Sequence, residues 1–413
     1  MQYSKKYPWI LVGLLWVVAL LNYMDRQMLS TMKPAMQMDI AELQSATNFG
    51  YLMAIFLWIY GLMSPVSGLI ADRFNRKWLI VYSLFVWSAV TFAMGYATTF
   101  NQIYWLRAIM GISEALYIPA GLSLIADFHS SKTRSLAIGI HMTGLYMGQA
   151  LGGFGATVAA KFSWQATFHS FGMVGILYSA VLIIFLKNKE VSAAPTTTEG
   201  MPVTKRPPLF KGLATLFSNS AFWIILFYFA VASLPGWATK NWLPTLFAQN
   251  LNIPMSQAGP LSTITIAASS FVGVMFGGIL SDRWVQRNIK GRVYTSAIGL
   301  ALTIPSLLLL GFGHSLFNVI GAAVCLGFGF GMFDANNMPI VCQFVSARYR
   351  ATAYGMMNMT GVFFGAFITD LLGKSSDAGN LGRDFAILSG IVIIALFIQV
   401  YFLHPKNNDF AEV

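Results

Sequence analysis

Ionisable side chains inside long apolar runs are the chemically most informative residues of this sequence. Asp25 and Arg26 lie in one such run, and Arg107 and Glu114 lie in another. Because Arg107 and Glu114 are seven residues apart, a helix places them on one face, roughly 10 Å apart along its axis. Charges are costly in hydrocarbon, so such residues usually face a cavity and a partner. Two cations and two acids can form a balanced network that binds an anion and exchanges protons, or a structural ion-pair cluster.

A second polar group interrupts the apolar runs of the C-terminal half. Asn336 and Asn337 suit a polyhydroxylated ligand, since amides both donate and accept. Hydrogen bonding between helices explains them equally well. Lys240 either faces a cavity or extends to the membrane interface. Asp334 is expected to pair with Lys240 or to serve as a third proton site. The remaining ligand-binding candidates of this half are Trp237 and Asn358.

The elements that position these residues are predicted to be transmembrane helices. The chain has 413 residues, of which 56% are hydrophobic and 10% charged, against roughly 25% charged in a soluble domain. Apolar runs of about 20 residues recur, and in lipid such runs must be helical to satisfy their backbone groups. Twelve spans are predicted, at 8–30, 48–71, 77–98, 102–126, 134–160, 166–187, 221–246, 257–282, 292–312, 315–340, 350–373 and 384–404.

Basic residues predict the orientation of these spans. Most Lys and Arg residues fall in loops on the side of the N-terminus. The opposite loops hold only Lys33, Lys161, Lys374 and Arg383. The positive-inside rule therefore places both termini in the cytoplasm. The formal charge of +11 is then a topology signal, and no nucleic-acid partner is expected. The first span carries two charges and lacks a cleavage site, so we expect a retained helix instead of a signal peptide.

An internal repeat divides the chain into halves. The pattern G-x-x-x-D-R occurs at 68–73 and again at 278–283. The pattern G-x-x-[E/D]-A-x-x-x-P occurs at 111–119 and at 331–339. Duplication predicts an N-terminal six-helix bundle over 1–187, a cytoplasmic central loop over 188–216 and a C-terminal six-helix bundle over 217–413. In transporters such halves enclose a substrate path at the middle of the membrane.

The loop that follows the second span resembles the signature loop of the major facilitator superfamily. It reads G-x-x-x-D-R-x-x-R-K from Gly68 to Lys77. The resemblance implies an all-α membrane fold in which charge pairs latch the outward-open state, although a plain interfacial charge cluster fits too. Gly68 is expected to admit a neighbouring helix, and Asp72 to attract cations at its helix end. The gating candidates are Gly68, Asp72, Arg73, Arg76, Arg134, Asp282 and Arg283.

A narrower resemblance rests on Asn22-Tyr23-x-Asp25-Arg26 and Arg107-x6-Glu114. Together with Trp58-Ile59-Tyr60 and Trp242-Leu243-Pro244-Thr245, these motifs are similar to the anion:cation symporter family of sugar-acid, hexuronate and sialate carriers. The resemblance implies that Arg26, Arg107 and Tyr60 bind substrate and that Asp25 and Glu114 carry protons. Where some members have a glutamine before the tyrosine, Leu145 precedes Tyr146. The further polar candidates near the site are Tyr23, Tyr146 and Gln149.

These features predict a proton-coupled symporter of a small organic anion in the inner (plasma) membrane. The helix 102–126 motif Glu114-Ala115-x-Tyr117 also resembles Spinster-type lysolipid and sphingolipid transporters, so a lipid substrate stays open, as does a neutral sugar or drug. Na⁺ is the alternative coupling ion. No enzyme is expected, because the sequence has no nucleophile-and-base constellation, metal spacing or phosphate loop. We expect no cofactor, and a monomer in the lipid bilayer.

Overall fold

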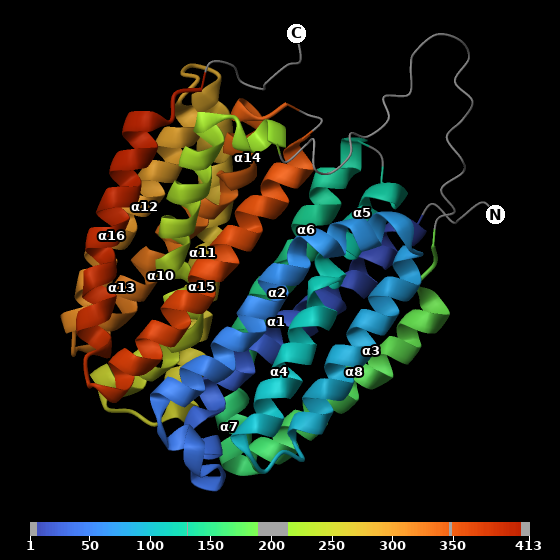
Figure 1. Cartoon of the computed structure of the whole chain (residues 1–413), viewed down its shortest axis with the longest axis vertical. Helices are drawn as coiled ribbons and strands as arrows, with labels where there is room; N and C mark the ends of the chain where they lie inside the picture. Colours follow the sequence, from blue (N-terminus) through green and yellow to red (C-terminus); the bar gives the residue numbers. More distant parts are fainter. Residues whose placement is uncertain (1–5, 130, 189–213, 347–348, 406–413) are drawn as a thin grey trace.

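The computed structural model describes residues 6–129, 131–188, 214–346 and 349–405, apart from the side chains of residues 69, 72, 73, 131, 132, 135 and 351. The described residues form an all-helical bundle (Figure 1). The elements of the N-terminal half are α1 (Tyr7–Asp39), η1 (Ala41–Gln44), α2 (Ala46–Arg73), α3 (Arg76–Met94), α4 (Phe100–Ala115), α5 (Tyr117–Phe128), α6 (Ser131–Gly152), α7 (Gly155–Lys161) and α8 (Trp164–Phe185). Those of the C-terminal half are α10 (Ser220–Leu251), α11 (Met255–Val285), α12 (Gly291–Phe312), α13 (Leu316–Ala335), α14 (Asn337–Phe344), α15 (Arg350–Asp377) and α16 (Leu381–Phe402).

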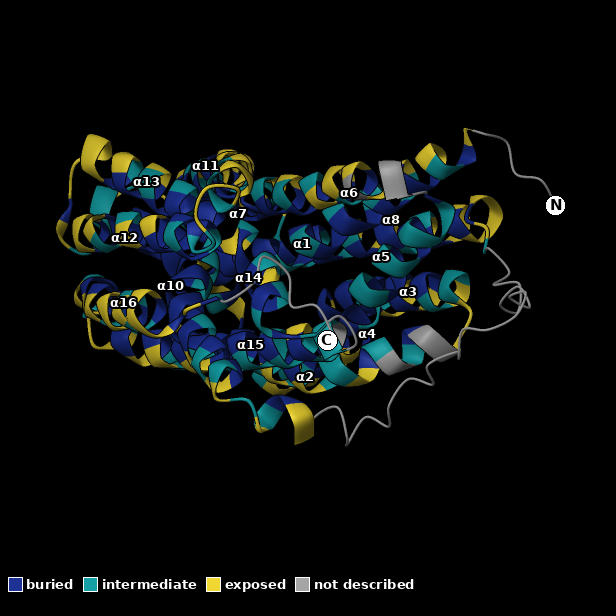
Figure 2. Cartoon of the chain, turned by 90° about the horizontal axis from the view of Figure 1, so that it is seen from above, coloured by how far each residue is buried: buried dark blue, intermediate teal, exposed yellow. Residues whose placement is uncertain are grey.

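Every predicted span overlaps a helix or a pair of consecutive helices. Eleven helical segments in the described residues are long and apolar enough to cross a membrane. The remaining predicted span, 134–160, is the fifth in chain order. It is covered by α6 and α7 and is not among these eleven. Leu177, Ile184 and Phe397 are among the large apolar side chains that are exposed. Figure 2 shows exposed positions along the outer sides of the helices, as a lipid-facing surface requires.

One predicted loop residue was wrongly assigned. Lys33 was expected in a loop after the first span, but α1 continues to Asp39 and Lys33 is buried in it. Its ammonium group lies 5.2 Å from the centroid of a Trp242 ring and 5.9 Å from that of Phe49. The aromatic faces offset part of the cost of burying this cation within the helix.

The repeated acidic motif breaks two helices at equivalent positions. One break separates α4 from α5 directly after Ala115, and the other separates α13 from α14 directly after Ala335. Pro119 and Pro339 lie four residues beyond these alanines. A proline lacks the N–H that would bond the carbonyl four residues earlier, and its ring clashes with that carbonyl. The motif therefore ends each helix one residue after its acid, Glu114 or Asp334.

The two halves contact each other along α2 and α15, and one such contact lies at the end of the bundle opposite to the one where α1 begins and α16 ends (Figure 1, lower part). There the start of α2 crosses the end of α15, and a Cβ on Gly50 would lie 3.3 Å from the Cα of Gly373. The two glycines let the backbones approach closely. Asp377 at the end of α15 accepts hydrogen bonds from Ser45, Ala46 and Thr47 around the first turn of α2. This contact closes that end of the molecule.

Candidate functional site

The centre of the N-terminal half holds an ion pair between α1 and α4. Nε of Arg26 lies 2.6 Å from Oε2 of Glu114. The same oxygen accepts a hydrogen bond of 3.0 Å from Nδ2 of Asn22. The Glu114 side chain is fully buried, whereas 13% of the Arg26 side chain is exposed. The pair therefore sits at the border between the packed bundle and solvent.

Aromatic rings surround the Arg26 guanidinium. Its Cζ lies 5.2 Å from the ring centroid of Tyr23, 4.9 Å from that of Phe56 and 4.6 Å from that of Tyr60. Phe56 also lies 4.5 Å below the Cζ of Arg107. One ring thus contacts both arginines, and such contacts hold guanidinium groups in place. The sequence reading missed Phe56, although its position four residues before Tyr60 places both rings on one face of α2.

Arg107 and Asp25 have partners other than the expected ones. Arg107 is 3% exposed, and its Nη1 donates to the sulfur of Met110 at 3.2 Å. Asp25, also buried, accepts a hydrogen bond of 3.3 Å from the Thr91 hydroxyl on α3. The predicted four-membered network is therefore reduced in this structure to one direct pair, Arg26 with Glu114. Asp25 and Arg26 are neighbours on a helix and point about 100° apart, so they reach different helices.

Several polar atoms of this cluster are buried without a hydrogen-bond partner among the described residues. They are Arg26 Nη2, Arg107 Nε, Glu114 Oε1 and Asn22 Oδ1. Buried donors and acceptors are normally satisfied, and exceptions need an explanation. The two guanidinium nitrogens can donate hydrogen bonds to a carboxylate ligand. The unpaired oxygen of Glu114 can accept a proton.

A second charged group lies in the C-terminal half. Nζ of Lys240 on α10 lies 4.7 Å from the Trp237 ring centroid and 6.0 Å from that of Tyr23. Asp334 on α13 accepts a hydrogen bond of 3.1 Å from Asn337. Asp334 is exposed, and it lies within electrostatic range of Lys240 and Tyr23. Asp334 is thus accessible to solvent, and Lys240 is half-buried.

The other ligand-binding candidates are dispersed. Asn336 is fully buried, and its amide donates to the backbone oxygen of Met332, four residues earlier in the chain, so this bond is not the expected bond between helices. Asn358 on α15 bonds the Ser64 hydroxyl on α2 and so links the halves. The half-buried Tyr146 has its ring 6.1 Å from Phe271 across the two halves. Gln149 is buried on the same helix as Tyr146.

The predicted gate at the helix ends near the termini is only partly described. The side chains of Asp72 and Arg73 lie outside the described residues. Arg76 pairs with Asp127 at the end of α5, a partner that was not predicted. Arg134, Asp282 and Arg283 are exposed.

Gly68 does not make the expected close helix contact in this structure. Among the described atoms, nothing lies within 4 Å of the position of a Cβ on Gly68 or on its repeat equivalent Gly278. The helix faces that carry these glycines are therefore separated from their neighbours, while the opposite end of the molecule is closed.

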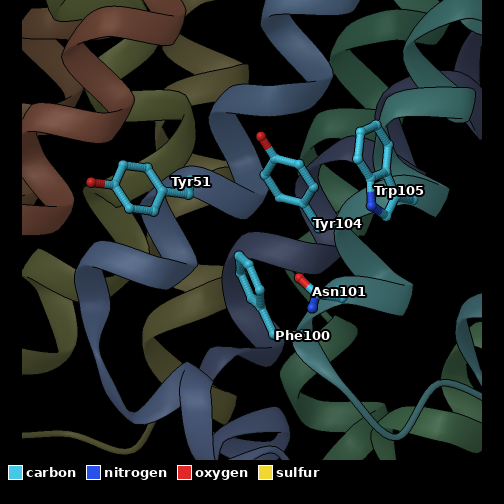
Figure 3. Close-up of a pocket in the computed structure, with 5 residues that line it drawn as sticks. All are labelled: Tyr51, Phe100, Asn101, Tyr104 and Trp105. Carbon is cyan, nitrogen blue, oxygen red and sulfur yellow. The ribbon is translucent and has the colours of Figure 1, made fainter.

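An aromatic pocket at the molecular surface is distinct from the charged cluster. It has a volume of about 420 Å³ and is lined by Tyr51, Phe100, Asn101, Tyr104 and Trp105 (Figure 3). Its residues come from α2 and from the beginning of α4. Tyrosine and tryptophan at helix ends are typical of the membrane–water interface. None of the lining residues is charged, so the pocket does not extend the ion-pair site.

A family model and similar proteins of known sequence all point to one family of transporters. The family model described as Major Facilitator Superfamily matches residues 15–369. The hexuronate transporter of Bacillus subtilis (strain 168) is 25% identical over 438 residues, which cover 99% of this chain and 98% of the relative. The probable galactarate/D-glucarate transporter of Escherichia coli (strain K12) is 24% identical over 381 residues, covering 86% of this chain and 84% of the relative.

Solved structures support the same fold. A bacterial homolog to the human lysosomal transporter Spinster, in an inward-facing and unoccupied conformation, matches with a TM-score of 0.83 at 19% identity over 100% of both chains. The nucleoside transporter NupG matches with a TM-score of 0.71 at 18% identity, covering 94% of this chain and 99% of the other. At such identities the likeness shows the fold alone.

Proposed function

Because the chain belongs to the Major Facilitator Superfamily, we propose that this multi-pass membrane protein is a proton-coupled symporter of a sugar acid. The chain is a transporter and not an enzyme, because its family and the relatives compared above are transporters. The proposal includes twelve transmembrane spans, in which α6 and α7 together form the fifth. It places the protein in the inner (plasma) membrane, with both termini in the cytoplasm. In this orientation the end at which Asp377 contacts the start of α2 faces outward.

The observation that carries the proposal is the buried pair of Arg26 and Glu114 with its unused atoms. A substrate carboxylate can bind Arg26 Nη2 and Arg107 Nε, which have no protein partner, by charge-assisted hydrogen bonds. A proton on Glu114 removes the charge that competes with the substrate for Arg26. Anion and proton therefore bind together more favourably than either does alone, which is the requirement for symport.

The relatives support a sugar acid as the anion. Those compared above are named for hexuronate and for galactarate and D-glucarate, all of which carry carboxylates and hydroxyl groups. Tyr23 and Tyr60, beside Arg26, can bond the hydroxyl groups of such a ligand.

Alternating access follows from the two-half architecture. With anion and proton bound, the halves rock about the middle of the membrane, and the contact between Asp377 and the start of α2 breaks and re-forms in each cycle. Proton release inside restores the ion pair of Arg26 with Glu114 and allows the empty carrier to return. Asp25, which is held by Thr91, is a second proton site in this proposal.

Uptake by proteoliposomes tests the proposal. An inward proton gradient should drive accumulation of labelled hexuronate, galactonate or galactarate, and a protonophore should abolish it. Na⁺ alone should not replace the gradient. Failure of every sugar acid to be accumulated, with uptake of a lysolipid or a neutral sugar instead, would refute the proposed substrate class.

A further inference from the structure

The Lys240 group repeats the geometry of the Arg26 group in the other half. Arg26 follows Tyr23 by three residues on α1, and Lys240 follows Trp237 by three residues on α10. The offset between the pairs is 214 residues, close to the offsets of the repeated motifs. In both halves the cation lies over the ring of that aromatic residue, at 5.2 Å for Arg26 and 4.7 Å for Lys240.

Each cation also has an acid from the equivalent helix. Glu114 on α4 and Asp334 on α13 occupy the same position of the repeated acidic motif. Glu114 is held by Asn22 and forms a direct ion pair with Arg26. Asp334 is held by Asn337 and attracts Lys240, but these two described residues form no direct ion pair. The cation and the acid of the N-terminal half thus form a direct ion pair, whereas those of the C-terminal half are separated.

The two cations share one ring across the interface between the halves. The Cζ of Arg26 and the Nζ of Lys240 both lie within 6.0 Å of the Tyr23 ring centroid, so they lie within twice that distance of each other. A six-carbon chain with a carboxylate at each end spans roughly 6–8 Å, as its extended bond geometry dictates. Such a molecule can place one carboxylate on each cation.

We propose that Lys240 forms a second carboxylate subsite, so that the preferred substrate is a dicarboxylate sugar acid carrying a carboxylate at both ends. Asp334 competes with the second carboxylate for Lys240, as Glu114 competes with the first for Arg26. In the complex, each acid carries a proton and each cation binds one carboxylate. The two protons balance the two negative charges of the substrate, so the net charge of the site is the same as in the empty carrier. This inference rests on the proposed function and defines its substrate class.

The test compares galactonate, which has one carboxylate, with galactarate, which has two, on the full-length protein in proteoliposomes. The wild type should bind galactarate about tenfold more tightly, because one charge-assisted hydrogen bond contributes roughly 1.5–3 kcal/mol and 1.4 kcal/mol is a factor of ten. In Lys240→Met this ratio should fall to about one, and Lys240→Arg should restore it.

Lys33→Met is the matched control, because the Lys33 ammonium also lies over a tryptophan ring, although Lys33 is buried at the closed end of the bundle whereas Lys240 is half-buried. It should leave the galactarate-to-galactonate ratio unchanged. Equal affinities in the wild type, or a ratio that survives in Lys240→Met, would overturn this inference while galactonate uptake still supported the proposed function. Absence of binding of either acid would overturn both.

Discussion

Glu114 holds Arg26 through one carboxylate oxygen, Oε2, at 2.6 Å from Nε, while its other oxygen and the Nη2 of Arg26 have no partner in the part of the chain that the structure describes. Arginine and carboxylate can form two parallel hydrogen bonds, so half of a possible bidentate bridge is unused. A monodentate pair leaves donors for a ligand, whereas a bidentate pair would have to break before binding. This geometry fits an ion pair that exchanges partners during transport.

Arg107 should be irreplaceable by lysine. Its Nε has no protein partner, and its guanidinium lies against Phe56. Lysine keeps the charge but loses the planar donor pair that matches a carboxylate. We expect Arg107→Lys to weaken sugar-acid binding by about tenfold or more, which is about 1.4 kcal/mol. Equilibrium binding to detergent-solubilised protein measures this, and an unchanged dissociation constant would remove Arg107 from the site.

Phe56 should affect substrate affinity although it carries no polar group. Its ring contacts both guanidinium groups, and each desolvated cation–π contact contributes about 0.5–2 kcal/mol. Phe56→Leu should therefore raise the dissociation constant roughly tenfold. Phe168→Leu is the control, because Phe168 is equally buried but packs on Trp164. Both variants should lower the melting temperature, and equal affinities in both would contradict the assignment.

Asp377 should stabilise the closed end of the carrier. Its carboxylate accepts hydrogen bonds from the backbone N–H groups of Ala46 (2.6 Å) and Thr47 (2.8 Å) at the N-terminus of α2. An acid in this position caps the helix and complements its dipole. Loss of such a cap costs about 1–2 kcal/mol. Asp377→Ala should therefore shift the equilibrium toward the state open at that end by roughly tenfold.

Distances between spin labels at Glu42 and Gln257, which are exposed on opposite halves, would report this shift once Cys325 and Cys342 are replaced by Ala. Asp384→Ala is the control, since Asp384 pairs with its chain neighbour Arg383 at the start of α16. The distance distribution should broaden toward longer values in Asp377→Ala only. Identical distributions in the two variants would show that the cap does not hold the halves together.

Much of the fold could be predicted from local signals. Apolar runs of spanning length give the helices, and the repeated acidic motif marks equivalent places in the two halves. The motif also contains the proline that breaks each helix, although the breaks after Ala115 and Ala335 were not predicted. The continuation of α1 past Lys33 was missed because the aromatic partners of that lysine lie on other helices.

The site was predictable only in part, because contacts between helices depend on how far each helix is rotated. The sequence placed Arg26 and Glu114 near each other, and their pairing follows. It could not show that Asp25 turns to Thr91 on α3, or that Phe56 lies beneath both arginines. The contact of Asp377 with Thr47 joins residues 330 positions apart, and no periodicity along the chain reports it.

The most direct measurement is proton-driven uptake by Glu114→Gln in proteoliposomes. Glutamine can still accept hydrogen bonds from Arg26 and Asn22 through its amide oxygen, but it cannot carry a proton. We expect accumulation against a gradient to be abolished and uptake to lose its dependence on the proton gradient, while exchange of internal for external sugar acid persists. Accumulation by Glu114→Gln at the wild-type level would contradict the claim that this ion pair couples protons to the substrate.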